Sequence, residues 1–129
     1  MTDLIQHYAR QPVWAVVGAS NDRRKYGNRI YRTLRNAGYT VYAVNHREDQ
    51  VEGDPAYAKL GDLPQIPTVV DMVIPPWNAL PVVQEAGALG VKAIWFQPGA
   101  EHPEAMRRAK QQGMDVIESC ILVHHVQIA

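Results

Sequence analysis

The residues best suited to chemistry in this chain follow an apolar segment near its start. Residues 13–17 run into Gly18-Ala19-Ser20, and a polar loop, a helical pattern and a second apolar run ending in Asn45-His46-Arg47 come next. Glycine and other small residues let the backbone approach a phosphate, and the N-terminus of the next helix adds unpaired N–H groups. The spacing therefore predicts a nucleotide-binding βαβ unit that receives a diphosphate or a similar anion.

Two well-known glycine patterns do not fit this loop. The glycine after Gly18 is Gly27, nine positions later, so neither G-x-G-x-x-G nor G-x-x-x-x-G-K-[ST] is present. The loop instead carries donors, among which we take Asn21 and Lys25 as candidate phosphate contacts together with residues 18–20. The alternative is a tight strand-to-helix turn followed by a solvated basic loop.

Asn45-His46-Arg47 occupies the place where NAD enzymes of this fold carry an acid that holds the ribose hydroxyls. The acid is missing here, and arginine suits a phosphorylated ribose because guanidinium forms paired hydrogen bonds with phosphate oxygens. NADP and coenzyme A (CoA) both combine a diphosphate with a ribose phosphate. A solvated turn after the strand is the alternative.

Two later segments are expected at the same end of the sheet, where the ligand would bind. Ile74-Pro75-Pro76-Trp77 ends an apolar strand, and its prolines make a stiff apolar lip suited to an adenine or a pantetheine chain. Gln97-Pro98-Gly99 follows the next strand, where Gly99 permits close backbone approach. For the first of these segments the alternative is a purely structural one, the end of a strand and the start of a helix.

The elements that must position these residues alternate along the chain. Continuous apolar strands separated by single helices are typical of a parallel sheet covered on both faces. We predict one α/β domain over residues 1–129, a doubly wound, mostly parallel sheet of five or six strands with helices on both faces and its ligand at the carboxyl ends of the strands. The expected strands are 13–17, 40–44, 69–74, 93–96 and 115–117, and the expected helices are 3–10, 28–36, 79–89 and 103–112.

The segment from 47 to 67 gives the weakest pattern, because glycines and prolines are scattered through it. Within it we expect a short strand at 56–58 and a helical turn at 60–63. Buried roles are expected for Trp14 and Trp95, which fall inside strands, whereas Trp77 falls on a loop.

The amino-acid composition limits the kinds of partner that the protein is expected to bind. Thirteen basic and thirteen acidic residues cancel, so no basic field indicates a nucleic-acid partner. No apolar run approaches the length that spans a bilayer, and the first residues do not form a signal peptide. We expect a cytoplasmic protein without a membrane partner, which agrees with its single cysteine, Cys120.

Taken together, these segments resemble the small stand-alone CoA-binding domain proteins of bacteria and archaea, which are similar to the N-terminal CoA-binding domain of the succinyl-CoA synthetase alpha subunit and of ADP-forming acyl-CoA synthetases. The resemblance runs from about Val13 to His125. It implies a Rossmann-like fold that binds CoA, with residues 18–20 at the phosphates, 45–47 near the adenosine phosphate, and 74–77 and 97–99 lining the rest. The motifs that carry it are Gly18-Ala19-Ser20, Tyr42-Ala43-Val44-Asn45, Ile74-Pro75-Pro76, Trp95-Phe96-Gln97-Pro98-Gly99 and Cys120-Ile121.

The chain departs from that family at two places. Relatives commonly carry Phe-Arg where this chain has Val73-Ile74, and Asp-Arg where it has Glu118-Ser119. Any basic contacts from those positions are lost here, so we expect either a weaker affinity for CoA or an acyl-CoA ligand whose chain prefers the more apolar lip. The synthetases' phosphorylated histidine lies in a further domain, so the resemblance implies no ligase activity and no catalytic residue here.

Three functions stay open at this point. The first is a non-catalytic module that binds CoA or acyl-CoA for sensing or delivery, and the second is an NADP-binding oxidoreductase or its cofactor subunit. The third is a redox-responsive module in which Cys120 pairs with a low-molecular-weight thiol. No metal is expected, because Cys120 and His124 supply only two ligands on one segment. A homodimer through an edge strand or an apolar helix face is left open.

Overall fold

The structure, a computed structural model, describes residues 2–124, and His125, where the resemblance ends, lies outside them. Its strands are β1 (Val13–Val17), β2 (Thr40–Val44), β3 (Gln50–Val51), β4 (Asp54–Tyr57), β5 (Val69–Met72), β6 (Ala93–Phe96) and β7 (Asp115–Glu118). Its helices are α1 (Thr2–Ala9), α2 (Tyr26–Asn36), α3 (Ala79–Leu89) and α4 (Pro103–Gln111), with short 3₁₀ turns η1 (Leu60–Asp62), η2 (Pro76–Asn78) and η3 (Ile121–Val123).

The strands form one sheet in the order β3-β4-β2-β1-β5-β6-β7. Every neighbouring pair is parallel except β3 and β4. β1 lies between β2 and β5, so the chain moves outward on one side of β1 and then returns to build the other side. The predicted α/β fold with a doubly wound, mostly parallel sheet is confirmed, and the direction of winding reverses at β1.

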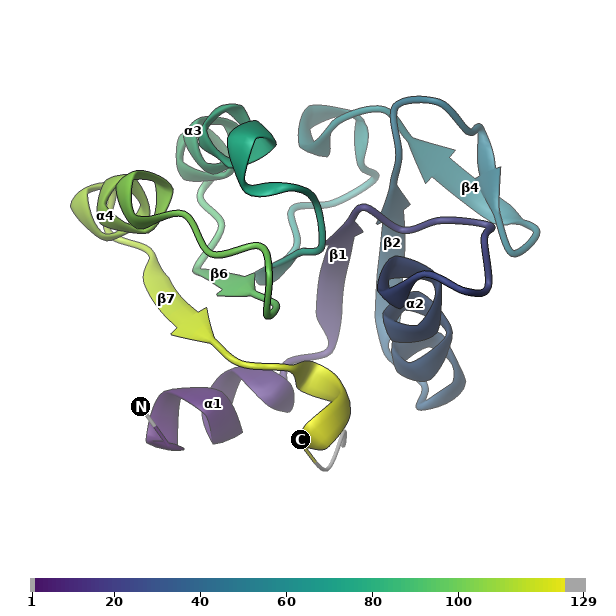
Figure 1. Cartoon of the computed structure of the whole chain (residues 1–129), viewed down its shortest axis with the longest axis horizontal. Helices are drawn as coiled ribbons and strands as arrows, with labels where there is room; N and C mark the ends of the chain where they lie inside the picture. The colour runs from purple at the N-terminus through teal and green to yellow at the C-terminus, as the bar shows by residue number, and fades with distance from the viewer. Residues whose placement is uncertain (1, 125–129) are drawn as a thin grey trace.

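Each face of the sheet is covered by its own helices, as Figure 1 shows, with α1 and α2 on one face and α3 and α4 on the other. Alternate residues of one strand enter opposite faces: Trp14 and Val16 pack with α1 and α2, whereas Ala15 and Val17 pack with α3 and α4. Both faces are covered, which is why the central strands β1, β5 and β6 are apolar apart from Asp71. Within residues 2–124 no helix is both long and apolar enough to cross a membrane.

The core follows the expected stripes. Ile30, Tyr31 and Leu34 of α2 are 0%, 2% and 0% exposed, because these positions share the helix face that lies on the sheet. Trp14 and Trp95 are fully buried with their ring centroids 5.5 Å apart, as expected for tryptophans inside strands.

The hairpin of β3 and β4 is the element that the sequence pattern did not predict. Its two-residue turn places Glu52 at φ 53° and Gly53 at φ 80°, and a glutamate is not the usual residue for that left-handed position. The strand expected at 56–58 is therefore wrong at its boundaries, since β4 begins at Asp54 and includes Pro55. The sheet has seven strands instead of five or six because this hairpin extends the β2 edge.

Candidate ligand-binding site

Two adjoining cavities lie at the carboxyl ends of the parallel strands, beside the point where the strand order reverses. The larger cavity, about 970 Å³, lies over the ends of β1 and β2, and the smaller, about 470 Å³, lies over the ends of β5, β6 and β7. Tyr26, Val73, Ile74 and Pro75 line both cavities. An elongated ligand that crosses this shared wall would contact both compartments.

The larger cavity is built on the loop between β1 and α2. Gly18, Ser20, Lys25 and Gly27 line it, and α2 begins at Tyr26 with no side chain capping its first turn. The first N–H groups of a helix have no partner within the helix, and they carry the positive end of its dipole. This end of α2 is consequently suited to an anion, as the βαβ pattern predicts.

The two glycines of the loop have a packing role. Gly18 adopts φ 104°, and a Cβ there would lie 2.4 Å from the carbonyl oxygen of Val73. A Cβ on Gly27 would lie 2.0 Å from the carbonyl oxygen of Gly18. The absence of side chains is therefore needed for the backbone segments to pass each other, independently of any ligand.

Several basic side chains surround the larger cavity. Arg24, Lys25, His46, Arg47 and Lys59 line it. Arg24 is paired with Asp22 at 3.0 Å, and its hydrogen bonds lower the pKa of that carboxyl to about 2.

Three other basic side chains of this lining differ from Arg24, because they have no ion-pair partner among residues 2–124. Across residues 2–124, the side chains of Lys25, Arg47 and Lys59 make no hydrogen bond or ion pair. The one acid in the lining, Glu85, accepts hydrogen bonds from the backbone of Leu60 and Gly61, each at 3.1 Å. Lys25, Arg47 and Lys59 line the same cavity as the N-terminus of α2, and such a combination of groups suits phosphate.

Asn45 joins the loops that follow β1 and β2. Its amide nitrogen donates to the carbonyl oxygen of Ala19 at 2.9 Å, and its side-chain oxygen accepts from the backbone N–H groups of Arg47 and Glu48. The asparagine thus holds the start of the segment that presents Arg47 to the cavity.

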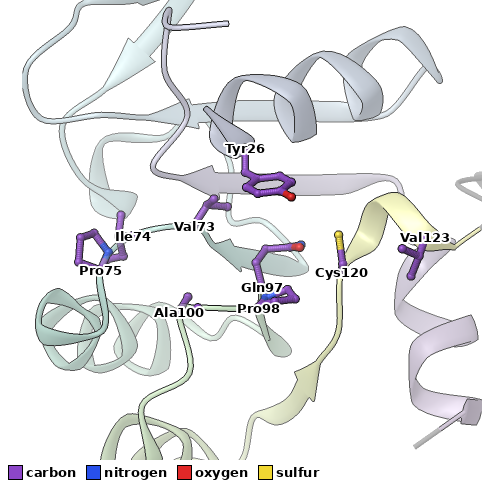
Figure 2. A pocket seen from close by; sticks show the side chains of 10 residues that line it. Tyr26, Val73, Ile74, Pro75, Gln97, Pro98, Ala100, Cys120 and Val123 are labelled. Carbon is purple, nitrogen blue, oxygen red and sulfur yellow. The ribbon is translucent and has the colours of Figure 1, made fainter. Parts of the chain in front are cut away.

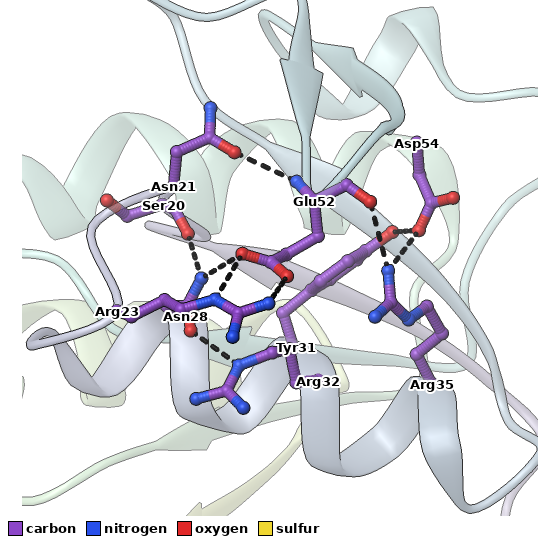
Figure 3. A network of polar contacts seen from close by, with 9 residues as sticks. All are labelled: Ser20, Asn21, Arg23, Asn28, Tyr31, Arg32, Arg35, Glu52 and Asp54. Carbon is purple, nitrogen blue, oxygen red and sulfur yellow. Dashed lines mark hydrogen bonds and ion pairs between the residues drawn. The ribbon is translucent and has the colours of Figure 1, made fainter.

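A polar cluster beside the cavity holds the loop against the hairpin (Figure 3). Glu52 accepts hydrogen bonds from Arg23 at 2.7 Å and from the buried Asn28 at 2.9 Å, and these lower its pKa to about 2. Asn21 donates to the carbonyl of Gln50 and accepts from the N–H of Glu52. The predicted phosphate donor Asn21 is therefore engaged in binding the hairpin.

The smaller cavity has a different character. Pro98, Gly99 and Ala100 from the loop after β6 line it, together with Gln97, Cys120 and Val123 (Figure 2). Gln97 is only 3% exposed, and its amide nitrogen donates to both carboxylate oxygens of Asp71 at 2.8 and 3.0 Å. Burial raises the pKa of Asp71 to about 8. The lining is otherwise mostly apolar, which suits an uncharged chain.

Most of the predicted site residues gather at these cavities, and a few do not. Ala19 is fully buried in the core, Asn21 serves the hairpin, and Pro76 and Trp77 lie in η2 outside both linings. Trp77 is 77% exposed. The predicted residues that line a cavity are Gly18, Ser20, Lys25, Asn45, His46, Arg47, Ile74, Pro75, Gln97, Pro98 and Gly99.

Sequence reasoning did not place Lys59, Tyr26 or Val73 in the site. Lys59 follows β4, whose boundaries the sequence pattern missed, so nothing in the sequence linked it to Arg47. Tyr26 opens α2, which begins two residues before the expected start. Val73 could have been predicted, because it lies directly before the apolar lip expected at residues 74–77.

Comparisons with known proteins agree with this geometry. A family model described as CoA binding domain matches residues 12–126. The ADP-forming acetate–CoA ligase I of Archaeoglobus fulgidus is 36% identical over 128 residues, which cover 91% of this chain and 19% of the ligase. The chain spans about a fifth of the length of the acetate–CoA ligases that it matches.

Solved structures of small proteins share the whole fold. A hypothetical protein from Pyrococcus horikoshii OT3 is 29% identical with a TM-score of 0.90, and the match covers 95% of this chain and 87% of that one. Cell-free ID.343 from Thermus thermophilus is 30% identical with a TM-score of 0.85, and the match covers 94% of this chain and 92% of that one.

Proposed function

Because the chain belongs to the CoA-binding domain family, we propose that it binds CoA or an acyl-CoA thioester at the carboxyl ends of its parallel strands. In this proposal the chain is a binding, sensing or carrier module that acts in the cytoplasm. One observation carries it: a cationic compartment and an apolar compartment share a wall. CoA has the same division, since its phosphates and nucleotide lie at one end and its uncharged pantetheine arm at the other.

The proposed orientation follows from the charges. The diphosphate lies at Gly18, Ser20 and the N-terminus of α2, where Lys25 has no other partner. The ribose phosphate lies near His46, Arg47 and Lys59. In this orientation Ala19, Asn21, Pro76 and Trp77 do not contact the ligand.

The pantetheine arm crosses the shared wall in this orientation. Ile74 and Pro75 line both compartments, and Gln97, Pro98 and Gly99 line the second. The wall is apolar at Val73 and Ile74, which suits the arm and an acyl group attached to it.

Isothermal titration calorimetry tests the proposal, with CoA, acetyl-CoA, NADP, NAD and ATP compared in one buffer. We expect micromolar binding of CoA and acetyl-CoA and at least about tenfold weaker binding of the others, a difference of roughly 1.4 kcal/mol. NADP is the decisive control, because it also carries a diphosphate and a phosphate on the adenosine ribose, at the 2′ instead of the 3′ position, but has no pantetheine arm. Binding of NADP at the affinity of CoA, or no binding of CoA, would overturn the proposal.

A further inference from the structure

The chain's single cysteine lies at the end of the smaller cavity. Cys120 precedes η3, is partly exposed, and lines the cavity with Tyr26, Pro98 and Val123. Figure 2 shows its sulfur pointing toward the space that Tyr26 and Gln97 also face. A small thiol in this cavity therefore reaches Cys120 without a change in the fold.

A second, independent feature of the same cavity points to a ligand. Gln97 is 3% exposed, and its side-chain oxygen has no hydrogen-bond partner in the described part of the chain. Its amide nitrogen is held by Asp71, so the oxygen is directed away from that carboxylate. A buried acceptor without a partner destabilises a protein. A ligand with an amide N–H would satisfy it.

The pantetheine arm of CoA has this chemistry. It carries amide N–H groups along an otherwise uncharged chain, and it ends in a thiol. With the phosphates bound in the cationic compartment, the arm passes Ile74 and Pro75 and enters the cavity that Gln97 and Cys120 line. The thiol end of the ligand and the protein thiol then share one compartment.

Resting on the proposed function, we infer that Cys120 captures CoA as a mixed disulfide by thiol–disulfide exchange with a disulfide of CoA. The Cys120 thiolate attacks one sulfur of the CoA disulfide, the sulfur–sulfur bond of the reagent breaks, and a new bond joins Cys120 to CoA. The second CoA leaves as a thiolate and takes up the proton that Cys120 lost. One disulfide replaces another, so no further oxidant is needed.

The exchange makes retention of the ligand depend on redox state. In the reduced protein CoA dissociates freely, whereas in the mixed disulfide it stays until another thiol attacks. While the disulfide persists, Cys120 is also protected from irreversible oxidation. The site would therefore report or store the oxidised form of CoA.

Intact-mass spectrometry of the reduced protein tests the inference, with CoA disulfide compared with cystamine. Cystamine carries the same two-carbon disulfide ends, with free amines in place of the amides, and lacks the rest of the pantetheine arm, the nucleotide and the phosphates. We expect an adduct of one CoA less two hydrogen atoms, formed at a rate that saturates and exceeds the cystamine rate about tenfold or more, because binding raises the local concentration of the disulfide. Cys120→Ser gives no adduct with either reagent.

A pair of remote variants controls for general reactivity of the thiol. Arg47→Ala should lower the ratio of the CoA disulfide rate to the cystamine rate by about fivefold, since it removes a cation that has no other partner. Lys92→Ala removes an equal charge at the opposite ends of the strands, just before β6, and should leave the ratio unchanged.

The outcomes separate the two proposals. Calorimetric binding of CoA to the reduced protein, combined with equal rates for the two disulfides or with a rate that does not saturate, overturns the inference and leaves the proposed function standing. Absence of CoA binding overturns the proposed function. Binding together with a saturable, CoA-selective adduct supports both.

Discussion

Arg47 has a distinct place among the cations of the site, because it follows β2, the strand that carries the ribose-binding residue in related nucleotide folds. We predict that Arg47→Ala weakens CoA binding about tenfold or more, since a hydrogen bond to a charged group contributes roughly 1.5–3 kcal/mol. Dephospho-CoA, which lacks the ribose phosphate, should bind the variant about as well as the natural protein. Calorimetry with both ligands measures the difference.

Lys92→Ala is the matched control for this prediction, because the lysine is exposed and lies at the amino ends of the strands. Its affinity for both ligands should be unchanged. An equal loss of affinity for CoA and dephospho-CoA in Arg47→Ala would place the arginine at the diphosphate, and no loss for either ligand would place it outside the site; both results would contradict the assignment.

Asp71 is a buried acid whose only side-chain partner among the described residues is the Gln97 amide. Burial raises its pKa from 3.8 to about 8, so between these values the folded protein keeps a proton that the unfolded chain has lost. The free energy of unfolding must then fall as pH rises, by roughly 1.4 kcal/mol per pH unit from this group. Below about pH 4 and above about pH 8 the contribution is constant.

Asp71→Asn removes this titration while keeping an oxygen that can accept from Gln97. We expect the variant to gain stability relative to the natural protein as pH increases from about 5 to about 7, measured by urea unfolding at each pH. Parallel stability profiles for the two proteins would show that Asp71 ionises as it does in water.

At the scale of elements, Asn28 connects α2 with both the preceding loop and the β3–β4 hairpin. Its fully buried amide donates to the carbonyl of Ser20 and to Glu52, and its oxygen accepts from Arg32. We predict that Asn28→Ala lowers the free energy of unfolding by about 1–3 kcal/mol, because it removes three hydrogen bonds of a buried amide to partly buried partners.

The comparison for this prediction lies on the same helix. Asn36→Ala replaces an exposed asparagine at the last residue of α2 and should change stability by less than about 0.5 kcal/mol. Urea unfolding followed by circular dichroism measures both variants. Similar small effects would mean that Asn28 contributes little to holding the hairpin, which would then depend on its other contacts.

The elements differ in how well the sequence predicted them, for a physical reason. β1 and β6 are apolar runs that are almost entirely buried, and Gly90 and Gly113 end α3 and α4 in left-handed conformations of φ 88° and 85°, so local patterns predict them directly. The β3–β4 hairpin depends on contacts with residues far along the chain, such as that between Asn21 and Glu52. Such contacts leave no periodic signal.

The residues of the site also differ in how well the sequence predicted them. Arg47 and Gln97 follow strands with a clear apolar pattern, and they were expected at the ligand site because parallel strands end at one edge of a sheet. Lys59 was not, since it follows the strand whose limits were mistaken. Gly18 was assigned to phosphate approach, whereas the structure adds that its hydrogen side chain is required beside Val73.

At the scale of the whole molecule, both cavities depend on the reversal of strand order at β1. The loops after β1 and β5 leave toward opposite faces of the sheet, and the space that opens between them is lined by Gly18 on one side and by Val73 and Ile74 on the other. The chain has no net charge, so the unpaired cations act locally within this opening and do not form a general basic surface. The ligand is consequently selected by the shape of the opening as well as by its charge.

A ligand that binds across this opening contacts loops from both halves of the sheet and must stabilise the entire fold. At a CoA concentration of one hundred times its dissociation constant, the free energy of unfolding should rise by about 2.7 kcal/mol. For a domain of this size that increase corresponds to a thermal midpoint higher by roughly 5–15 °C, measured by circular dichroism. Dephospho-CoA should give a smaller shift at equal concentration, because it leaves Arg47 unpaired. A shift with ATP as large as that with CoA would show that only the phosphate compartment is used, in contradiction to a site that spans both cavities.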